Sequence, residues 1–293
     1  VYHYGLADKV VIESVASSSY HENGYVTSYL EVKNGHVVLE KKSSVSILAV
    51  NGATTVTVDQ NANSELFKVV PVGFDTIDTS KIKVIDKKVI SSKVETGTLE
   101  KMKYGGGTGD TKETAFELHT ASHLAAFAKD VNSGYFKVKE DKEDKYKYIY
   151  AKLCKDVDIS GMGWEPIGTI QHSFLGSFDG QGKTINGLTN VGYSPSSKLF
   201  GITRTAQNYG MAYGFFGVVG DMSGSNNDKS MLFENVKFTN VNINSSNANM
   251  LGVLIGADTN AAQKESTSVN SILSRDIIIK DITVNGTIKC NNN

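Results

Sequence analysis

The chain has 293 residues, 40% of them hydrophobic, and a formal net charge of −1. This length suffices for two domains with cores of their own, and the near-zero charge excludes the basic field typical of nucleic-acid-binding proteins. No apolar run approaches the about 20 residues that span a bilayer, and two distant cysteines, Cys154 and Cys290, exclude a disulfide framework and a zinc site of cysteines alone.

Residues 10–103 have the pattern of short strands separated by turns. β-Branched and aromatic residues lie on both sides of Asn34-Gly35 and again of Asn51-Gly52. Both pairs suit two-residue hairpin turns, because Asn and Gly accept the positive φ that such turns require. Since no helical period of useful length interrupts them, we predict an antiparallel β-sandwich domain over residues 1–103.

A glycine-rich polar stretch follows, KYGGGTGDTKET from Lys103 to Thr114. It lacks the glycine and lysine spacing of a phosphate-binding loop, so we interpret residues 104–113 as a linker. An apolar stripe then predicts a single helix near Thr114–Asn132.

Two histidines of this segment, His119 and His123, are four residues apart and would share one face of that helix. Such a pair can bind zinc, but the residues between them supply no general base. We therefore interpret both as half-exposed helix side chains, and we expect neither a metal nor a cofactor.

Five segments in the second half of the chain occur in a recognisable order. They are AFELHTASHLAAFAKDVNSG, YAKLCKDVDISGMGWEPIG, FLGSFDGQGKTINGL, YGFFGVVG and ENVKFTNVNI. The series resembles the GLUG-type repeat region of bacterial surface proteins over about Thr111–Ile288. The best-matching segment contributes Phe174, Gly176, Phe178, Asp179, Gly180, Gly182, Thr184 and Ile185.

This resemblance implies a right-handed parallel β-helix over residues 114–293, with the α-helix as its N-terminal cap. The expected fold is therefore all-β with one α-helix. It also implies a bacterial protein that is secreted or displayed at the cell surface, in a family of mostly adhesin-like modules.

The physics of a repeated coil agrees with that architecture. Phe174, Phe178, Ile185 and Leu188 can stack inward on the next coil, while Gly176, Gly180 and Gly182 allow sharp corners. The charged run Lys137–Lys147 and the polar stretch Ser194–Met211 are longer than a minimal coil. We expect both to project as loops.

No catalytic constellation stands out among the thinly spread acids of this region. We therefore predict a binding or adhesion module without catalytic activity, whose partner is a surface protein or glycan of a host or a bacterium. Its candidate ligand-binding residues are Trp164, Tyr193, Tyr209 and Tyr213, whose rings could stack on a sugar or, alternatively, cover the ends of the core. Two alternatives stay open: a structural subunit of an extracellular fibre, and a polysaccharide lyase or hydrolase.

The carboxyl end, DITVNGTIKCNNN, follows a strand pattern and provides no apolar cap. Solenoids normally protect their last coil. We therefore expect further coils or a domain after Asn293, or a partner at this end. We also expect self-association through this coil or through exposed strand edges.

Overall fold

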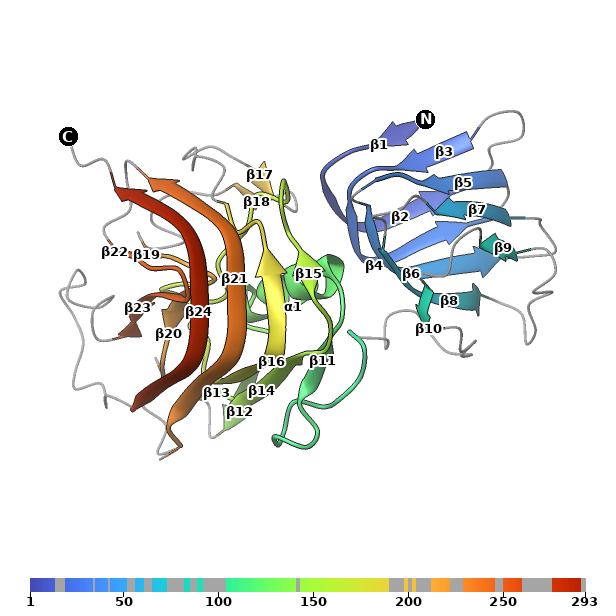
Figure 1. Cartoon of the computed structure of the whole chain (residues 1–293). Coiled ribbons are helices and arrows are strands. Elements are labelled where there is room, and N and C mark those ends of the chain that lie inside the picture. Colours follow the sequence, from blue (N-terminus) through green and yellow to red (C-terminus); the bar gives the residue numbers. More distant parts are fainter. Residues whose placement is uncertain are drawn as a thin grey trace. The chain divides into compact units, whose positions relative to one another are not determined.

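A computed structural model of the chain (Figure 1) describes residues 1–13, 19–33, 35–41, 43–51, 56–60, 65–72, 82–84, 89–91, 104–140, 143–189, 198–199, 202–203, 212–221, 229–245, 250–259 and 276–290. The chain divides into two compact units. The first comprises residues 1–105 and 120–126, and the second comprises residues 106–119 and 127–293.

The described residues of the first unit form ten strands, and successive strands belong alternately to one and the other of two five-stranded sheets. Odd-numbered strands form the sheet β1-β3-β5-β7-β9, and even-numbered strands form the sheet β10-β8-β6-β4-β2. The strands are β1 (Tyr2–His3), β2 (Leu6–Ile12), β3 (Ser19–Glu22), β4 (Tyr25–Val32), β5 (Gly35–Leu39), β6 (Ser44–Asn51), β7 (Val56–Gln60), β8 (Glu65–Val72), β9 (Ile82–Val84) and β10 (Val89–Ser91).

Strands in both sheets pair in parallel, so the predicted antiparallel sandwich is wrong. Asn34 lies outside the described residues, and Gly35 is the first residue of β5. Strands β4 and β5 belong to different sheets, so they do not form the predicted hairpin. Alternating apolar and polar residues mark any half-buried strand, so the pattern did not distinguish parallel from antiparallel pairing.

Apolar side chains at matching register positions fill the interior of the first unit. Leu30 lies opposite Leu48, and Val26, Val45 and Leu66 form a second row across three strands. All five side chains have an exposed fraction of 0%. Burying a side chain of this kind contributes about 1.5–3 kcal/mol relative to leaving it in water.

One carboxylate, Glu22, is also fully buried in the first unit. Its Oε1 contacts His3 Nδ1 at 2.8 Å and accepts a hydrogen bond from Gly24 N at 2.8 Å, while Oε2 accepts one from Tyr20 Oη at 2.7 Å. Burial, and then this bond to a carboxylate, raise the pKa of Tyr20 far above its ordinary value. Glu22 thus ties together residues from β1, β3 and the turn that follows β3.

Replacing this carboxylate should destabilise the first unit. Glu22→Ala leaves the Tyr20 hydroxyl and the Gly24 amide without their acceptor, and we expect a loss of about 1–3 kcal/mol in the free energy of unfolding. Urea unfolding followed by circular dichroism measures it, while the fluorescence of Trp164, the single tryptophan, reports the second unit separately. The matched control is Glu13→Ala, whose exposed ion pair with Lys33 should be worth under about 1 kcal/mol. Equal losses in both variants would contradict the prediction.

The second unit is built around a parallel sheet with the order β11-β14-β16-β21-β24, to which β15 adds by pairing with β16. These strands are β11 (Phe116–Leu118), β14 (Ile149–Leu153), β15 (Val157–Asp158), β16 (Gly176–Asn186), β21 (Met231–Ser245) and β24 (Ile277–Cys290). We call it the long sheet, because its last three strands run side by side over 11 to 15 residues (Figure 1).

Four short two-stranded pairs complete the unit. Strands β19 (Ala212–Tyr213) and β22 (Met250–Leu251) pair in parallel, as do β20 (Phe216–Val219) and β23 (Ile255–Asp258). Strands β12 (Lys137–Glu140) and β13 (Glu143–Tyr146) form an antiparallel hairpin within the charged run. Strands β17 (Lys198–Leu199) and β18 (Ile202–Thr203) form another. The protein is thus mostly β, with several parallel sheets.

The described residues contain one helix, α1 (Ala121–Asn132). It begins later than the sequence pattern predicted, because Phe116–Leu118 form strand β11 and pair with β14. Thr120 marks the boundary: its side-chain oxygen accepts a hydrogen bond from the His123 amide at 3.1 Å. A threonine in this position satisfies an amide that the first helical turn leaves without a partner.

Phenylalanine rings form the core between the long sheet and the β20–β23 pair. Phe216 of β20 lies 4.9 Å, between ring centroids, from both Phe174 and Phe233. The inward placement predicted for Phe174, Phe178, Ile185 and Leu188 is confirmed, since each is at most 2% exposed.

The glycines of this segment play two different roles. Gly182 has φ of 72° and lies where the pairing of β16 with β21 shifts register, so it acts as a bend. Gly176 lies inside β16, and a Cβ there would overlap the carbonyl oxygen of Ile149. Glycine is therefore required at position 176 because two strands approach closely there. The corner that we predicted for Gly176 is wrong.

Candidate binding site on the outer face of the long sheet

Register places five charged residues in one row across the long sheet. The paired positions are Glu117 with Lys152, Lys152 with Asp179, Asp179 with Glu234, and Glu234 with Lys280. Residues that pair across strands point to the same side, and Phe178 and Phe233, which precede Asp179 and Glu234, are buried on the other side. The five residues therefore lie on the outer face. We call them the charged row.

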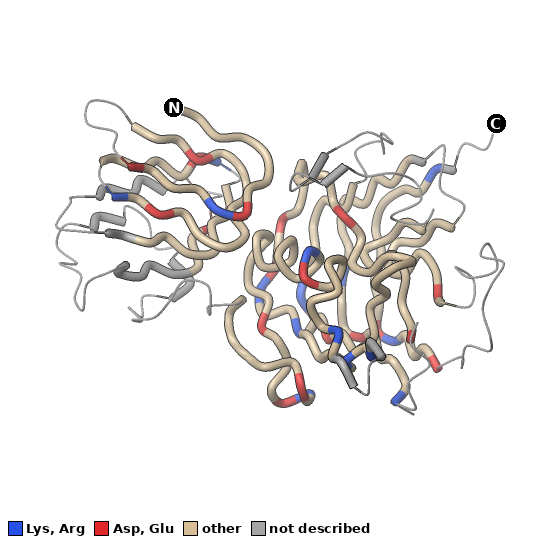
Figure 2. The backbone as a smooth tube through the Cα atoms, turned by 180° about the vertical axis from the view of Figure 1, so that it is seen from behind, with Lys and Arg blue, Asp and Glu red and all other residues tan. Residues whose placement is uncertain are grey.

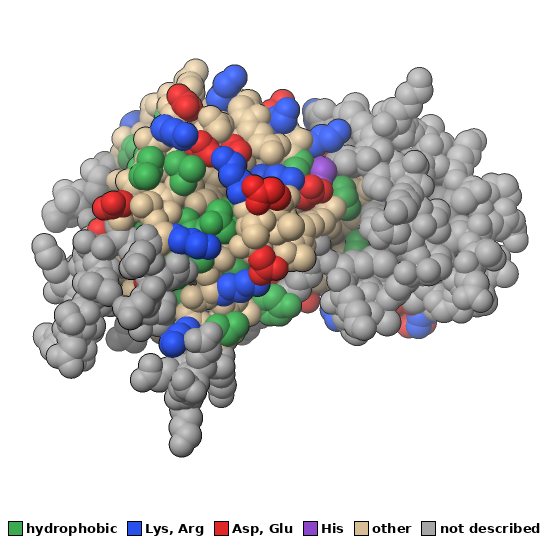
Figure 3. Space-filling view, turned by 90° about the horizontal axis from the view of Figure 1, so that it is seen from below, with side chains coloured by type: hydrophobic (Ala, Val, Ile, Leu, Met, Phe, Trp, Pro, Cys, Tyr) green, Lys and Arg blue, Asp and Glu red, His purple; other side chains and the backbone are tan. Residues whose placement is uncertain are grey.

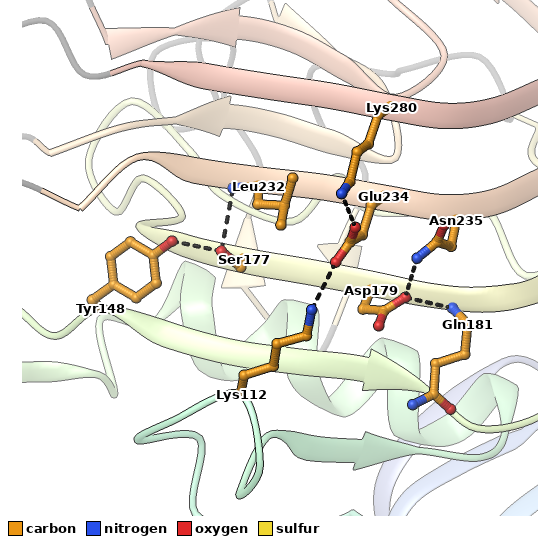
Figure 4. A network of polar contacts seen from close by, with 9 residues as sticks. All are labelled: Lys112, Tyr148, Ser177, Asp179, Gln181, Leu232, Glu234, Asn235 and Lys280. Carbon is orange, nitrogen blue, oxygen red and sulfur yellow. Dashed lines mark hydrogen bonds and ion pairs between the residues drawn. The ribbon is translucent and has the colours of Figure 1, made fainter.

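Glu234 is the most enclosed member of the charged row, with a side chain only 6% exposed. Figure 4 shows it between two lysines: Lys280 Nζ lies 2.9 Å from Oε2, and Lys112 Nζ lies 3.1 Å from Oε1. Burial raises the pKa of Glu234, but the hydrogen bonds from Lys280 and Lys112 outweigh burial and hold the pKa below its ordinary value. Glu234 is thus an ionised carboxylate at neutral pH.

Asp179 is also held by several donors. Its Oδ1 accepts hydrogen bonds from the Gln181 amide at 2.8 Å and from Asn235 Nδ2 at 3.1 Å (Figure 4). Gln181 and Asn235 both have positive φ, of 50° and 57°. Because the left-handed region is unfavourable for residues with a side chain, these bonds help to keep the backbone in place there.

Next to the charged row, Ser177 and Tyr148 form a second polar contact. Tyr148 Oη donates to the carbonyl oxygen of Ser230 at 2.7 Å, so the Ser177 hydroxyl donates to Tyr148 Oη, at 2.5 Å. Ser177 Oγ in turn accepts from the Leu232 amide at 3.2 Å. These bonds link β16 and β21 to Tyr148, which immediately precedes β14.

A pocket of about 180 Å³ opens above this network. Its lining combines residues of β14, β16 and β21 with residues of the loop before β11: Lys112, Glu113, Ala115, Tyr150, Ala151, Lys152, Ser177, Phe178, Asp179, Gln181, Leu232 and Glu234. Drug-sized ligands occupy pockets of about 300–1,000 Å³. This one has room for a single sugar ring or one side chain.

The pocket mixes both charges with the half-buried ring of Tyr150 and the buried Phe178. The Nζ atom of Lys229 lies 5.5 Å from the ring centroid of Tyr150. Acidic and basic residues are interspersed along the described backbone of this unit (Figure 2) and lie next to one another on the face seen in Figure 3. The described part of that face therefore carries charges of both signs side by side.

The aromatic residues predicted to bind a ligand are placed differently. Trp164 is 5% exposed, stacks on Phe215 at 4.9 Å and donates from Nε1 to the Phe215 carbonyl oxygen. Its ring presents no open face to a ligand. Tyr213 is half-buried in β19, while Tyr193 and Tyr209 lie outside the described residues. Trp164 and Tyr213 do not line the pocket.

Sequence reasoning missed the pocket because its members come from separate segments. Lys112 and Glu113 lie in the stretch that we interpreted as a linker, which in the structure bonds to strands: Gly109 O accepts from the Tyr150 amide, and Gly106 O accepts from the Glu117 amide. The sequence did contain one indication of the charged row. In both Phe178-Asp179 and Phe233-Glu234, an acidic residue directly follows an aromatic residue that faces the core, so it must point to the outer face.

Comparisons with known proteins give limited guidance. No protein-family model matches the chain, and no solved structure matches it. A protein of Evansella cellulosilytica, whose name describes it as a Gly-rich membrane protein, is 32% identical over 131 residues. The match covers 43% of this chain and 12% of that protein. In the described part of the chain, no helix is long and apolar enough to cross a membrane.

The two lysines should make Glu234 a pH-dependent source of stability. Since its folded pKa lies below the unfolded value, its contribution is complete at neutral pH and is lost as the pH falls below about 4.5. We expect Glu234→Gln to lower the free energy of unfolding by about 1–3 kcal/mol at pH 7. The deficit should shrink towards pH 3.

Urea titrations at several pH values, followed by Trp164 fluorescence, measure this difference. Asp276→Asn is the matched control, because Asp276 is an exposed carboxylate and should change stability by at most about 0.5 kcal/mol. A deficit for Glu234→Gln that is the same at pH 3 and pH 7 would show that its charge is not responsible.

Proposed function

We propose that the chain is part of a bacterial cell-surface protein and binds an uncharged glycan end group in the pocket above the charged row. The observation that carries this proposal is the pocket itself, which offers fixed donors and acceptors beside the Tyr150 ring. Sugar rings combine hydroxyl groups with apolar faces, and such a lining can satisfy both. The resemblance to GLUG-type surface modules and the name of the matched protein support the location.

The paired strands of the second unit would serve as a rigid platform for that site. We interpret each unit, taken by itself, as a right-handed parallel β-helix, in agreement with the parallel pairing in both units. Side chains on strands that pair along their length are held more firmly than side chains on free loops. A surface protein can therefore present such a site at a distance from the cell.

Glycoside hydrolysis fits the pocket less well than binding does. A hydrolase needs a carboxylic acid whose pKa is raised so that it can donate a proton to the leaving group. The pKa of Glu234 is instead lowered by two lysines, and Asp179 Oδ1 already accepts two hydrogen bonds. We therefore favour recognition over catalysis.

Screening the chain on an array of bacterial and host glycans tests the proposal. We expect Tyr150→Ala to weaken binding of any positive glycan about tenfold, because a stacked ring contributes on the order of 1 kcal/mol beyond the area it buries. Tyr135→Ala is the matched control, since Tyr135 is 58% exposed and does not line the pocket. An array without signal above background, or equal binding by Tyr150→Ala, would overturn the proposal.

A second function, as a subunit of an extracellular assembly, is favoured by strand β24. Among the described strands it pairs with β21 alone. Ile279, Val284 and Ile288 lie opposite the buried Phe233, Phe238 and Ile243, yet they are 53%, 46% and 45% exposed. Such an edge combines open backbone groups with a row of apolar side chains, which suits a strand from a second copy.

Charged substitutions on the inward positions of β24 test this second proposal. We expect the chain to self-associate with rising concentration and the double variant Ile279→Lys, Val284→Lys to remain monomeric, because a lysine there would have to be buried on pairing. Sedimentation velocity measures the difference. Thr283→Lys, on the opposite side of the same strand, should associate like the wild type. A wild type that stays monomeric at all concentrations would contradict the expectation.

A further inference from the structure

Three side chains with metal-binding atoms converge where β11 and β14 end. Glu117 lies in β11, His119 follows that strand, and Cys154 follows β14. The strands are parallel, with Leu118 opposite Leu153, and Cys154 N donates to the Leu118 carbonyl oxygen at 2.8 Å. Register therefore places Cys154 beside His119. All three side chains are half-buried.

The distances between these atoms suit a tetrahedral metal ion. One ligand atom from each residue lies within 4.8 Å of the other two, and His119 Nε2 is 3.5 Å from Glu117 Oε2. Ligands of a tetrahedral Zn²⁺ ion, bonded at about 2.0–2.3 Å, are about 3.4–3.6 Å apart. The nitrogen and the oxygen already have this spacing, and the Cys154 sulfur lies within 4.8 Å of both.

We propose that Glu117, His119 and Cys154 form a Zn²⁺ site whose fourth ligand is a water molecule. Thiolate and imidazole together select zinc over calcium or magnesium, which prefer oxygen ligands. A zinc ion with three protein ligands and one exchangeable position is a common arrangement. The site is separate from the pocket above the charged row, although Glu117 is the first residue of that row.

Neighbouring lysines have two opposite effects on metal binding: one orients the carboxylate of Glu117, and all of them repel a cation. Lys152 Nζ holds Glu117 Oε1 at 3.0 Å and leaves Oε2 directed to His119, so the carboxylate would bind through one oxygen. A thiolate and a carboxylate balance the two charges of the metal. Lys152, Lys155 and Lys183 act on the cluster electrostatically and oppose a cation. We therefore expect micromolar and not nanomolar affinity.

Zinc binds cysteine as a thiolate, so metal binding at this site must displace the proton of the thiol. Burial lowers the pKa of His119, which keeps the imidazole neutral as a ligand must be. Burial and the charge of Glu117 raise the pKa of Cys154, so the free thiol carries its proton at neutral pH. Binding then forms the S–Zn bond, breaks the S–H bond and releases one proton to the buffer.

The sequence did not reveal this cluster, because the spacing of His119 and His123 suggested that these two residues lie together on one helix. That pairing assumed a helix through both residues, but the chain is extended at Glu117–Leu118 and helical only from Ala121. His123 is 1% exposed within α1 and does not belong to the cluster. The partner of His119 is 35 residues later in the chain, and only the pairing of β11 with β14 reveals it.

Titration of the reduced full chain with ZnCl₂ in a calorimeter tests the proposal. We expect one equivalent to bind, with release of one proton measured by comparing two buffers. Cys154→Ser, His119→Gln and Glu117→Gln should each weaken binding at least tenfold. Cys290→Ser and His36→Gln are the matched controls and should bind like the wild type. Titration with CoCl₂ should give a thiolate charge-transfer band that only Cys154→Ser removes.

A measurement on the unmodified chain keeps the test independent of variant folding. Zinc should slow alkylation of Cys154 by iodoacetamide at least tenfold, as followed by peptide mass spectrometry, and EDTA should restore the rate. Absence of saturable binding, unchanged alkylation of Cys154, or a cobalt band that survives in Cys154→Ser would each overturn the proposal.

Discussion

The second unit depends on one constraint: apolar side chains must lie opposite apolar side chains on successive parallel strands. Phe178 of β16 lies opposite Phe233 of β21, and Phe233 lies opposite Ile279 of β24. A shift of one residue in β16 or β21 would turn its buried apolar side chains to solvent. The buried rings therefore fix the register of these strands, and the register determines which residues of the charged row lie opposite one another.

The polar surface of this unit is a consequence of that core. Glu234 meets Lys280 because their inward neighbours are stacked, and Lys112 reaches the same carboxylate from the loop before β11. A charged residue that loses water in this way must be compensated by partners, and the two lysines supply them. The same register brings His119 beside Cys154. The polar contacts of the outer face thus depend on the stacking of the strands.

Much of the architecture could be predicted from sequence, because it depends on local pattern. The inward positions of Phe174, Phe178 and Ile185 followed from spacing, as did the strand content of both units. Pairing direction in the first unit could not be predicted, since period-two alternation is common to parallel and antiparallel strands. Contacts such as Glu234 with Lys112 join residues over 100 positions apart, and no single segment contains the information that brings them together.

Glycines in the second unit allow close packing of neighbouring segments. A glycine-rich composition usually indicates a flexible or disordered chain. Here, Gly176 lies so close to the Ile149 carbonyl oxygen, and Gly109 so close to the Phe116 ring, that a methyl group would overlap either neighbour. Substitution to alanine would wedge adjacent segments apart and transmit the displacement to the next strand. The glycine content of such a unit therefore reports the tightness of its packing, and divergence at these positions is restricted by volume.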